Sequence, residues 1–522
     1  MRAYRKSLWL LLPGIALAGC AFPGGMAYEY RAAAPAPIHS GQEIATQAAH
    51  HTEDYAHIAD NPFLAAASNP LSTFSIDVDT ASYSNVRRFL RDGRLPPPDA
   101  VRIEELVNYF SYDYPQPEGE TPFSVVSEVG ACPWDPAHRL LHIGLQGRRI
   151  EAQAAPPRNL VLLLDVSGSM GTPRKLPLLK SAMRLLVEQL REEDHVAIVV
   201  YAGASGLVLP PTSGADRAAI LAALDRLQAG GSTNGGAGIQ LAYAVAAESL
   251  QPGGINRVIL ATDGDFNVGT TSHGALVRLI EQKRESGVFL TVLGLGTGNY
   301  KDSTAELLAD KGNGNYAYID SIDEARKVLV EQAGATLQTI AQDVKIQIEF
   351  NPARVEAYRL LGYENRLLRA EDFHDDRKDA GEIGAGHSVT ALYEIVPAGE
   401  ARDLARVDPL RYQQPRELSR EASSDELGSI KLRYKAPGAS SSQLISGTLI
   451  DRKAGLAAAS DNFRFSAAVA AFGMLLRRSP HKGNASYPLV QELSAGSLGP
   501  DQGGYRQEFT KLVARAVELS RG

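Results

Sequence analysis

The sequence predicts an α/β fold: a doubly wound, mostly parallel sheet over residues 158–335, flanked by β-rich segments and followed by terminal helices. Two observations carry this prediction. Apolar strand-like runs alternate with helical stretches throughout the region. The runs also lack alternating polar residues, which is typical of strands buried on both faces of a parallel sheet.

The alternation predicts each element of this unit in turn. The expected strands are 159–165, 195–203, 256–263, 288–296 and the shorter 315–320. The expected helices lie within 175–192, 216–228, 236–250, 274–286 and 304–310. Strands and helices that alternate in this order favour a doubly wound sheet over separate α and β layers.

Strand patterns lie on both sides of the α/β unit. Before it, we expect a strand and a helix over 72–90, a helix over 102–110, and strands over 122–134 and 138–147. After it, residues alternate at period two over 343–363, 387–397 and 428–437. The α/β unit is therefore predicted to be inserted into a β-sandwich built from both flanks. Amphipathic helices are expected over 462–479, 487–497 and 505–520.

A chain of 522 residues is too long for one hydrophobic core, so several domains are expected. We divide it into a signal peptide (1–19), a lipidated Cys with a flexible tether (20–60), an N-terminal α+β region (61–157), the α/β domain (158–335), a β-rich region (336–450) and a C-terminal helical region (451–522).

The N-terminus predicts export and a lipid anchor. Basic residues precede an apolar stretch that is too short for a transmembrane helix, as in a secretory signal. The stretch ends in "LAGC", which resembles the lipobox of bacterial lipoproteins and implies lipidation of Cys20. We therefore expect a protein anchored to a membrane of the bacterial cell envelope, facing the periplasm or the cell surface. Ala21 lacks the Asp that often signals inner-membrane retention, so the outer membrane is favoured.

Composition limits the partners and the covalent chemistry. The formal net charge is −7, which gives no reason to expect nucleic acid as a partner. The chain has two cysteines, so lipidation of Cys20 would leave Cys132 without an intrachain partner. We expect Cys132 to be a buried, inert thiol.

Polar side chains follow the apolar strands where a parallel sheet binds its ligands. Asp165, Ser167 and Ser169 follow the first strand, and Asp263 closes the third. Thr233 lies in a Gly-rich loop before a helix. Because ligands bind outside the carboxyl ends of parallel strands, these five oxygen-bearing side chains are expected at one edge. Oxygen ligands suit a hard cation, and we expect Mg²⁺, with Mn²⁺ or Ca²⁺ as alternatives.

These segments resemble a known family. "DVSGSM" is similar to the D-x-S-x-S signature of von Willebrand factor type A domains, and "GSTNGGAGI" and "LATDGD" resemble the family's later segments, in the family's order. Ser232 replaces a Gly of the pattern without removing a ligand. The resemblance implies a metal-ion-dependent adhesion site, with direct ligation by Ser167, Ser169 and Thr233. Asp165 and Asp263 would bind directly or through water.

The flanking segments resemble a narrower family. "NPLSTFSIDVDTASYSNVRRFL", "LGLGTGNYKD" and "NFRFSAAVAAFGMLLRR" are similar to YfbK-like bacterial lipoproteins that carry this domain. The resemblance implies a binding protein rather than an enzyme. We expect it to present the metal to an acidic group on a protein partner.

Three alternatives remain open. "SGSMG" is one residue from the nucleophile elbow of α/β-hydrolases, so Ser169 could serve a serine esterase with Asp263 and a histidine. The candidate histidines are His273, His374 and His387. A structural lipoprotein with an empty site is the second alternative. The third is a polar cluster in the tether that could bind metal, although a solvated linker is favoured: His50, His51, Glu53, Asp54 and His57.

Asp77 and Asp79 suggest a phosphotransferase of the haloacid-dehalogenase type. Ala81 stands where that motif needs Thr or Val. We therefore expect the two aspartates to be turn or cap residues. His273 lies close enough in sequence to rim the metal site, but an ordinary helix start is favoured.

Overall fold

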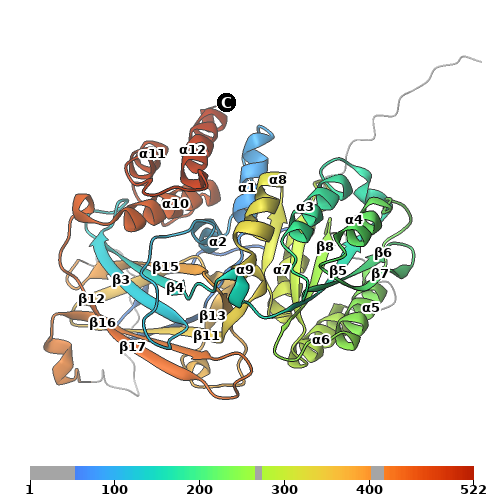
Figure 1. Ribbon diagram of the computed structural model, residues 1–522. Coiled ribbons are helices and arrows are strands. Elements are labelled where there is room, and N and C mark those ends of the chain that lie inside the picture. The colour runs from blue at the N-terminus through green and yellow to red at the C-terminus, as the bar shows by residue number, and fades with distance from the viewer. Residues whose placement is uncertain (1–52, 265–272, 401–416, 522) are drawn as a thin grey trace, which may run out of the picture. The chain divides into compact units, whose positions relative to one another are not determined.

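The computed structural model describes residues 53–264, 273–400 and 417–521. Residues 49–522 form one compact unit (Figure 1). The signal peptide, Cys20, His50 and His51 lie outside the described residues, so the predictions made for them stay predictions.

The predicted doubly wound sheet is present. It has six strands in the order β10-β9-β8-β5-β6-β7. All neighbours are parallel except β6 and β7. The strands are β5 (Arg158–Asp165), β6 (His195–Tyr201), β7 (Ser205–Ser213), β8 (Ile255–Thr262), β9 (Phe289–Leu295) and β10 (Tyr316–Ile319). The sequence did not predict β7, which contains Pro210 and Pro211. Prolines are tolerated there because β7 is an edge strand.

Helices cover both faces of this sheet, as Figure 1 shows. One face packs against α3 (Leu176–Glu188), α4 (Arg217–Asp225) and α8 (Ile322–Arg326). The other packs against α5 (Gly235–Glu248), α6 (His273–Glu285) and α7 (Asp302–Lys311). A π-helical turn, Lys327–Glu331, and α9 (Ala333–Leu337) lead out of the unit. β5 is fully buried because both of its faces are covered.

Strands from both flanks form a β-sandwich, which confirms the predicted insertion. One antiparallel sheet contains β1 (Leu64–Ala65), β12 (Val355–Leu361), β15 (Ser388–Pro397), β4 (Arg139–Gly147) and β3 (Phe123–Ala131). The other contains β13 (Leu367–Leu368), β2 (Leu71–Ser75), β11 (Thr339–Phe350), β16 (Glu426–Lys435) and β17 (Gln443–Ile450), with β14 (Gly381–Gly384) beside β11. Alternate residues of both sheets share one apolar core.

The remaining helices form a third apolar core beside the sandwich. They are α1 (Ala81–Arg91), α2 (Ile103–Asn108), α10 (Asp461–Arg477), α11 (Tyr487–Ala495) and α12 (Tyr505–Arg521). Trp134 and Cys132 of the sandwich are buried against them. Cys132 is therefore a buried thiol, as predicted, and burial raises its pKa well above the ordinary value.

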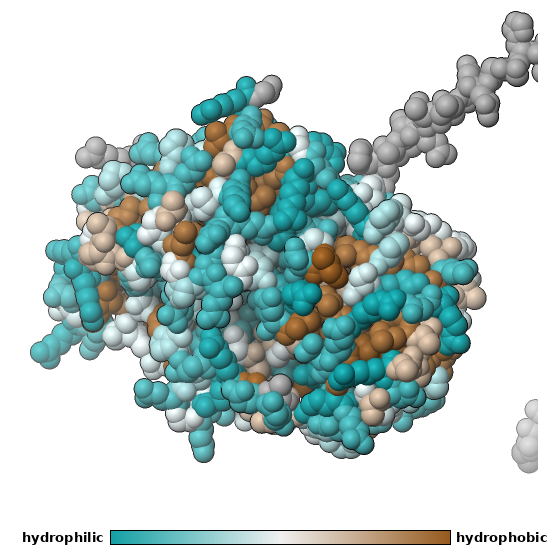
Figure 2. All heavy atoms as spheres, turned by 45° about the horizontal axis from the view of Figure 1, so that its top comes forward, coloured by the Kyte–Doolittle hydropathy of each residue, from teal (hydrophilic) through white to brown (hydrophobic). Residues whose placement is uncertain are grey.

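In the view of Figure 2, hydrophilic atoms separate the hydrophobic patches from one another. Within the described ranges, no helix combines the length and the hydrophobicity needed to cross a bilayer.

A buried ion network joins the α/β unit to the sandwich. The Arg366 guanidinium lies 3.2 Å from a carboxylate oxygen of Asp77 and 3.5 Å from one of Asp79, and it also pairs with Asp310 of α7. Burial and the neighbouring Asp77 raise the pKa of Asp79 well above its ordinary value, against the effect of Arg366. We call this contact between the α/β unit and the sandwich the seam. Its buried carboxylates depend on Arg366 for their counter-charge.

Arg366→Leu is expected to destabilise the protein by about 3–5 kcal/mol, because it leaves buried carboxylates without a counter-charge. Urea unfolding measures the change. Arg377→Leu is the matched control, since Arg377 pairs with Asp375 on the surface and is 92% exposed. Equal stability of the two variants would show that the seam does not depend on this cation.

Candidate metal site

Strand register brings the predicted site residues to one edge of the sheet. In β5, Leu164 pairs with Ala261 of β8, and Asp165 pairs with Tyr201 of β6. Asp165 therefore ends β5 at the level where Thr262 and Asp263 end β8. Both carboxylates are buried, with Asp165 at 0% and Asp263 at 1% exposure.

Hydrogen bonds join four of the five predicted residues. The Ser167 backbone N–H donates to Asp165 Oδ1 at 2.8 Å, which turns the chain sharply after the strand. The Ser167 and Ser169 hydroxyls lie 3.1 Å apart. Ser169 Oγ donates to Asp263 Oδ2 at 2.6 Å. Solvent exposure increases along the turn, since Ser167 is buried and Ser169 is exposed.

The fifth residue, Thr233, lies in a loop that is bonded to the turn after β5. The Gly168 N–H donates to Gly231 O at 3.0 Å, and the Gly230 N–H donates to Val166 O at 2.8 Å. These two bonds fasten the Gly-rich loop alongside the Asp165–Ser169 turn. Thr233 is half-buried, just before the start of α5.

Burial controls the charge of the site. Burial, together with the nearby Asp263 carboxylate, raises the pKa of Asp165 to about 6, against the lowering effect of hydrogen bonds from Ser167. Two buried carboxylates at one point are costly unless a cation compensates them. The site is therefore built to gain from a positive charge.

Sequence reasoning missed three residues that supply polar contacts here, two of them at Asp263. Lys175, just before α3, places its Nζ 2.9 Å from Asp263 Oδ2 and 3.1 Å from Asn299 Oδ1. The Asn299 side-chain amide lies 3.4 Å from Asp263 Oδ2. No local pattern identifies either residue, because both reach Asp263 only through packing of separate loops. Thr262, also missed, lies 3.5 Å from Asp165 Oδ2.

The donor set fits a hard divalent cation. Two carboxylates and hydroxyls from Ser167 and Ser169 are all oxygen ligands, with Thr233 in the adjoining loop. Because Mg²⁺ usually keeps some waters, such a site leaves room for an oxygen from outside. The exposed Ser169 marks the side from which that oxygen can approach.

The other acidic clusters have structural explanations. Carboxylate oxygens of Asp77, Asp79 and Glu105 lie within 4.8 Å of one another. Arg366 and Arg102 bind them. The Asp79 N–H donates to Asp77 Oδ1 at 3.0 Å, which confirms the predicted turn role of Asp77. Asp79 instead accepts from the Tyr316 N–H at 2.7 Å.

Glu53 and His57 of the predicted tether cluster have separate partners. Glu53 binds Arg88 at 2.9 Å, and His57 binds Asp99 at 3.1 Å. Glu53, whose side chain is 9% exposed, is therefore docked on the domain, which supports neither a tether metal site nor the expected solvated linker at this residue.

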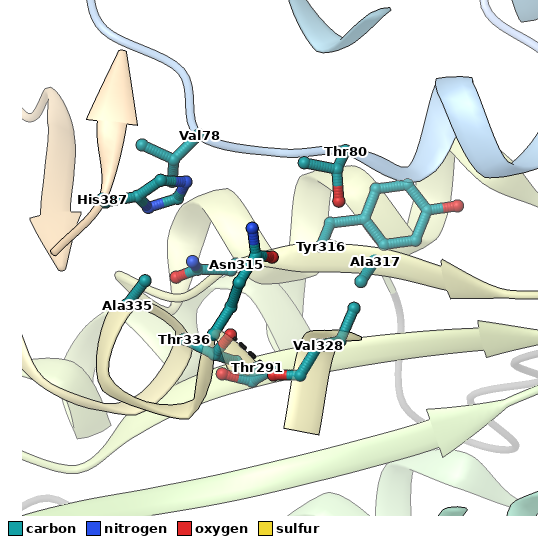
Figure 3. Close-up of a pocket in the computed structure, with 11 residues that line it drawn as sticks. Val78, Thr80, Thr291, Asn315, Tyr316, Ala317, Val328, Ala335, Thr336 and His387 are labelled. Carbon is teal, nitrogen blue, oxygen red and sulfur yellow. Dashed lines mark hydrogen bonds between the residues drawn. The ribbon is translucent and has the colours of Figure 1, made fainter. Parts of the chain in front are cut away.

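The hydrolase alternative gains no support from the histidines that the structure describes. His387 lines a separate cavity of 20 Å³, with Thr80 and Asn315, that is about the size of one water (Figure 3). Burial lowers the pKa of His387 to about 4. His374 contacts Arg433, at 3.0 Å. The side chain of His273 lies outside the described residues, so its predicted role stays untested.

Comparison with known proteins first defines the class of domain. A family model described as "von Willebrand factor type A domain" matches residues 160–265, and one described as "von Willebrand factor" matches residues 49–142. A von Willebrand factor type A structure from Catenulispora acidiphila covers 76% of this chain and 92% of its own, at 18% identity and a TM-score of 0.41. Proteins of this class are generally non-enzymatic protein-interaction modules.

The narrower family follows from the whole chain. The family model described as "Uncharacterized protein YfbK, C-terminal" matches residues 335–519. YfbK from Escherichia coli is 45% identical over 472 residues, which cover 89% of this chain and 81% of that protein. The chain belongs to the YfbK family. A second relative, sll0103 from Synechocystis, is 30% identical over 36% of this chain and 44% of its own.

Affinity for Mg²⁺ is expected to fall about tenfold per pH unit below pH 6, because the Asp165 carboxyl, whose pKa is about 6, must lose its proton to bind. The sign follows from the raised pKa: the proton competes with the metal below it and not above it. The Mg²⁺-induced rise in melting temperature, titrated between about pH 5 and pH 8, measures the affinity. A constant affinity over that range would contradict ligation through Asp165.

Proposed function

We propose that this protein is a lipid-anchored, metal-dependent binding module that presents Mg²⁺ to a carboxylate of a partner protein. The observation that carries the proposal is the convergence of Asp165, Ser167, Ser169 and Asp263 at the carboxyl ends of β5 and β8. Mn²⁺ or Ca²⁺ are the alternative ions, since they accept the same oxygen ligands.

The chemistry of the site favours coordination over turnover. Bound metal would supply a positive centre whose coordination an oxygen from another molecule can complete. Asp165 and Ser167 are buried and hold the inner side of the site, whereas Ser169 is exposed at its rim. A partner's Asp or Glu could therefore reach the ion without opening the domain.

Asp165→Ala is expected to abolish partner capture from a cell-envelope extract, while wild-type capture requires Mg²⁺ and is lost in chelator. The fold should survive, because β5 is held by its aliphatic residues. The matched control is Asp225→Ala, which removes a carboxylate paired with Arg184 on the surface of the same domain. Capture by the Asp165 variant that resists chelator would rule out the adhesion mechanism.

We also propose that Cys20 carries lipid and holds the protein at a cell-envelope membrane, with the outer membrane favoured. The lipobox-like "LAGC" supports this proposal. Cys20→Ala should move the protein from the membrane fraction to the soluble fraction or leave its signal uncleaved. Unchanged fractionation and unchanged mass of the N-terminal peptide would contradict lipidation.

A further inference from the structure

Lys175 puts a buried positive charge inside the proposed metal site. The residue is 5% exposed, and its ammonium lies 2.9 Å from the same Asp263 oxygen that accepts a hydrogen bond from Ser169 at 2.6 Å. An ammonium group and a divalent ion at one carboxylate oxygen repel each other, most strongly where water is excluded. The Lys175 ammonium and the metal ion therefore compete for the Asp263 carboxylate.

The side chain of Lys175 is held in this position from two directions. Asn299 Oδ1 accepts a hydrogen bond from its Nζ at 3.1 Å. Gly296, at φ +80°, leaves a channel for the lysine stem, because a Cβ at this position would lie 2.3 Å from Lys175 Cε. Asn299 and Gly296 belong to one loop, residues 296–301, between β9 and α7.

This loop is itself fastened to the start of the described chain. The Asp54 N–H donates to Tyr300 O at 3.0 Å, and the Asp302 N–H donates to Asp54 O at 3.2 Å. Glu53 Oε1 accepts from the Gly298 N–H at 2.9 Å, and Arg88 binds the same carboxylate. Residues 53–54 thus bracket Asn299 on both sides along the loop.

The loop also packs directly behind the metal-binding strand end. Gly264 follows Asp263 and has φ +90°. A Cβ there would lie 2.3 Å from the Lys301 backbone N. Movement of the loop would therefore displace Asp263 as well as Lys175.

We propose that Lys175 is an internal counter-cation that competes with the divalent metal at Asp263, and that Glu53 and Asp54, through loop 296–301, hold it there. Lys175 is a positioning and tuning residue, not a ligand. The part of the chain that precedes the domain thereby sets the metal affinity of the site. This inference rests on the metal site proposed above.

Lys175→Met tests the first step, with Mn²⁺ as the probe and free Mn²⁺ followed by electron paramagnetic resonance on the full chain. The variant keeps the packing of the stem and removes the charge, so its Kd should fall at least about tenfold. The metal-free variant should also melt at a lower temperature than wild type, and its gain on adding metal should be larger. Damage to the site alone would weaken binding, so a gain in affinity separates the two explanations.

Two variants control for charge and for side-chain length. Lys180→Met removes the same charge from α3, the helix that follows Lys175. Lys180 binds the backbone carbonyls of Asp225 and Leu227, and its loss should leave the Kd unchanged. Lys175→Arg keeps the charge and should retain the weaker, wild-type-like affinity. An unchanged or higher Kd in Lys175→Met, with wild type binding Mn²⁺, would overturn the competition. If neither wild type nor Lys175→Met binds Mn²⁺, the proposed metal site itself is refuted.

Glu53→Gln tests the second step. The variant weakens the hydrogen bond that holds the Gly298 N–H and leaves the proposed metal ligands unchanged. Because the loop then holds Lys175 less firmly at Asp263, the Kd for Mn²⁺ should fall about twofold to fivefold, less than in Lys175→Met. Glu518→Gln, which removes a carboxylate paired with Arg515 on the surface, is the matched control and should have no effect. A Kd equal to or above the wild-type value in Glu53→Gln would refute the role of the N-terminal residues.

Discussion

The parallel register of β5 between β6 and β8 is the constraint on which the rest of the site depends. It places Asp165, the last residue of β5, within one residue of the level of Asp263, which follows the last residue of β8. A shift of one residue would turn the Asp165 side chain to the other face of the sheet. The aliphatic residues of β5 prevent that shift, because both faces are covered by helices.

Buried carboxylates also need a counter-charge at two places in the molecule. At the seam between the α/β unit and the sandwich, arginines supply the counter-charge permanently, as Arg366 does for Asp77 and Asp79. At the strand ends, Lys175 contacts Asp263, while burial leaves Asp165 with a raised pKa. The same physical requirement thus produces a fixed ion network in one place and, in our proposal, an exchangeable cation in the other.

The insertion of the α/β unit into the sandwich gives the site an external support. The chain enters the described region at Glu53 and Asp54, which bind the loop beside Asp263, and it leaves the α/β unit through the π-helical turn and α9 into β11. The site therefore lies close in the fold to the N-terminal connection. An isolated α/β domain, cut at Arg158, would lose that support.

The sequence by itself determined the class of the fold and the candidate ligand set. Aliphatic runs without polar alternation predicted the buried parallel strands, and residues 165–169, Thr233 and Asp263 followed from their places after strands or before a helix. The sandwich built from both flanks also followed, because period-two alternation is a local signal. The edge strand β7 and the roles of Lys175, Asn299 and Arg366 were decided by tertiary structure alone. Each depends on which distant segment packs against it, and such contacts leave no periodic signal in the sequence.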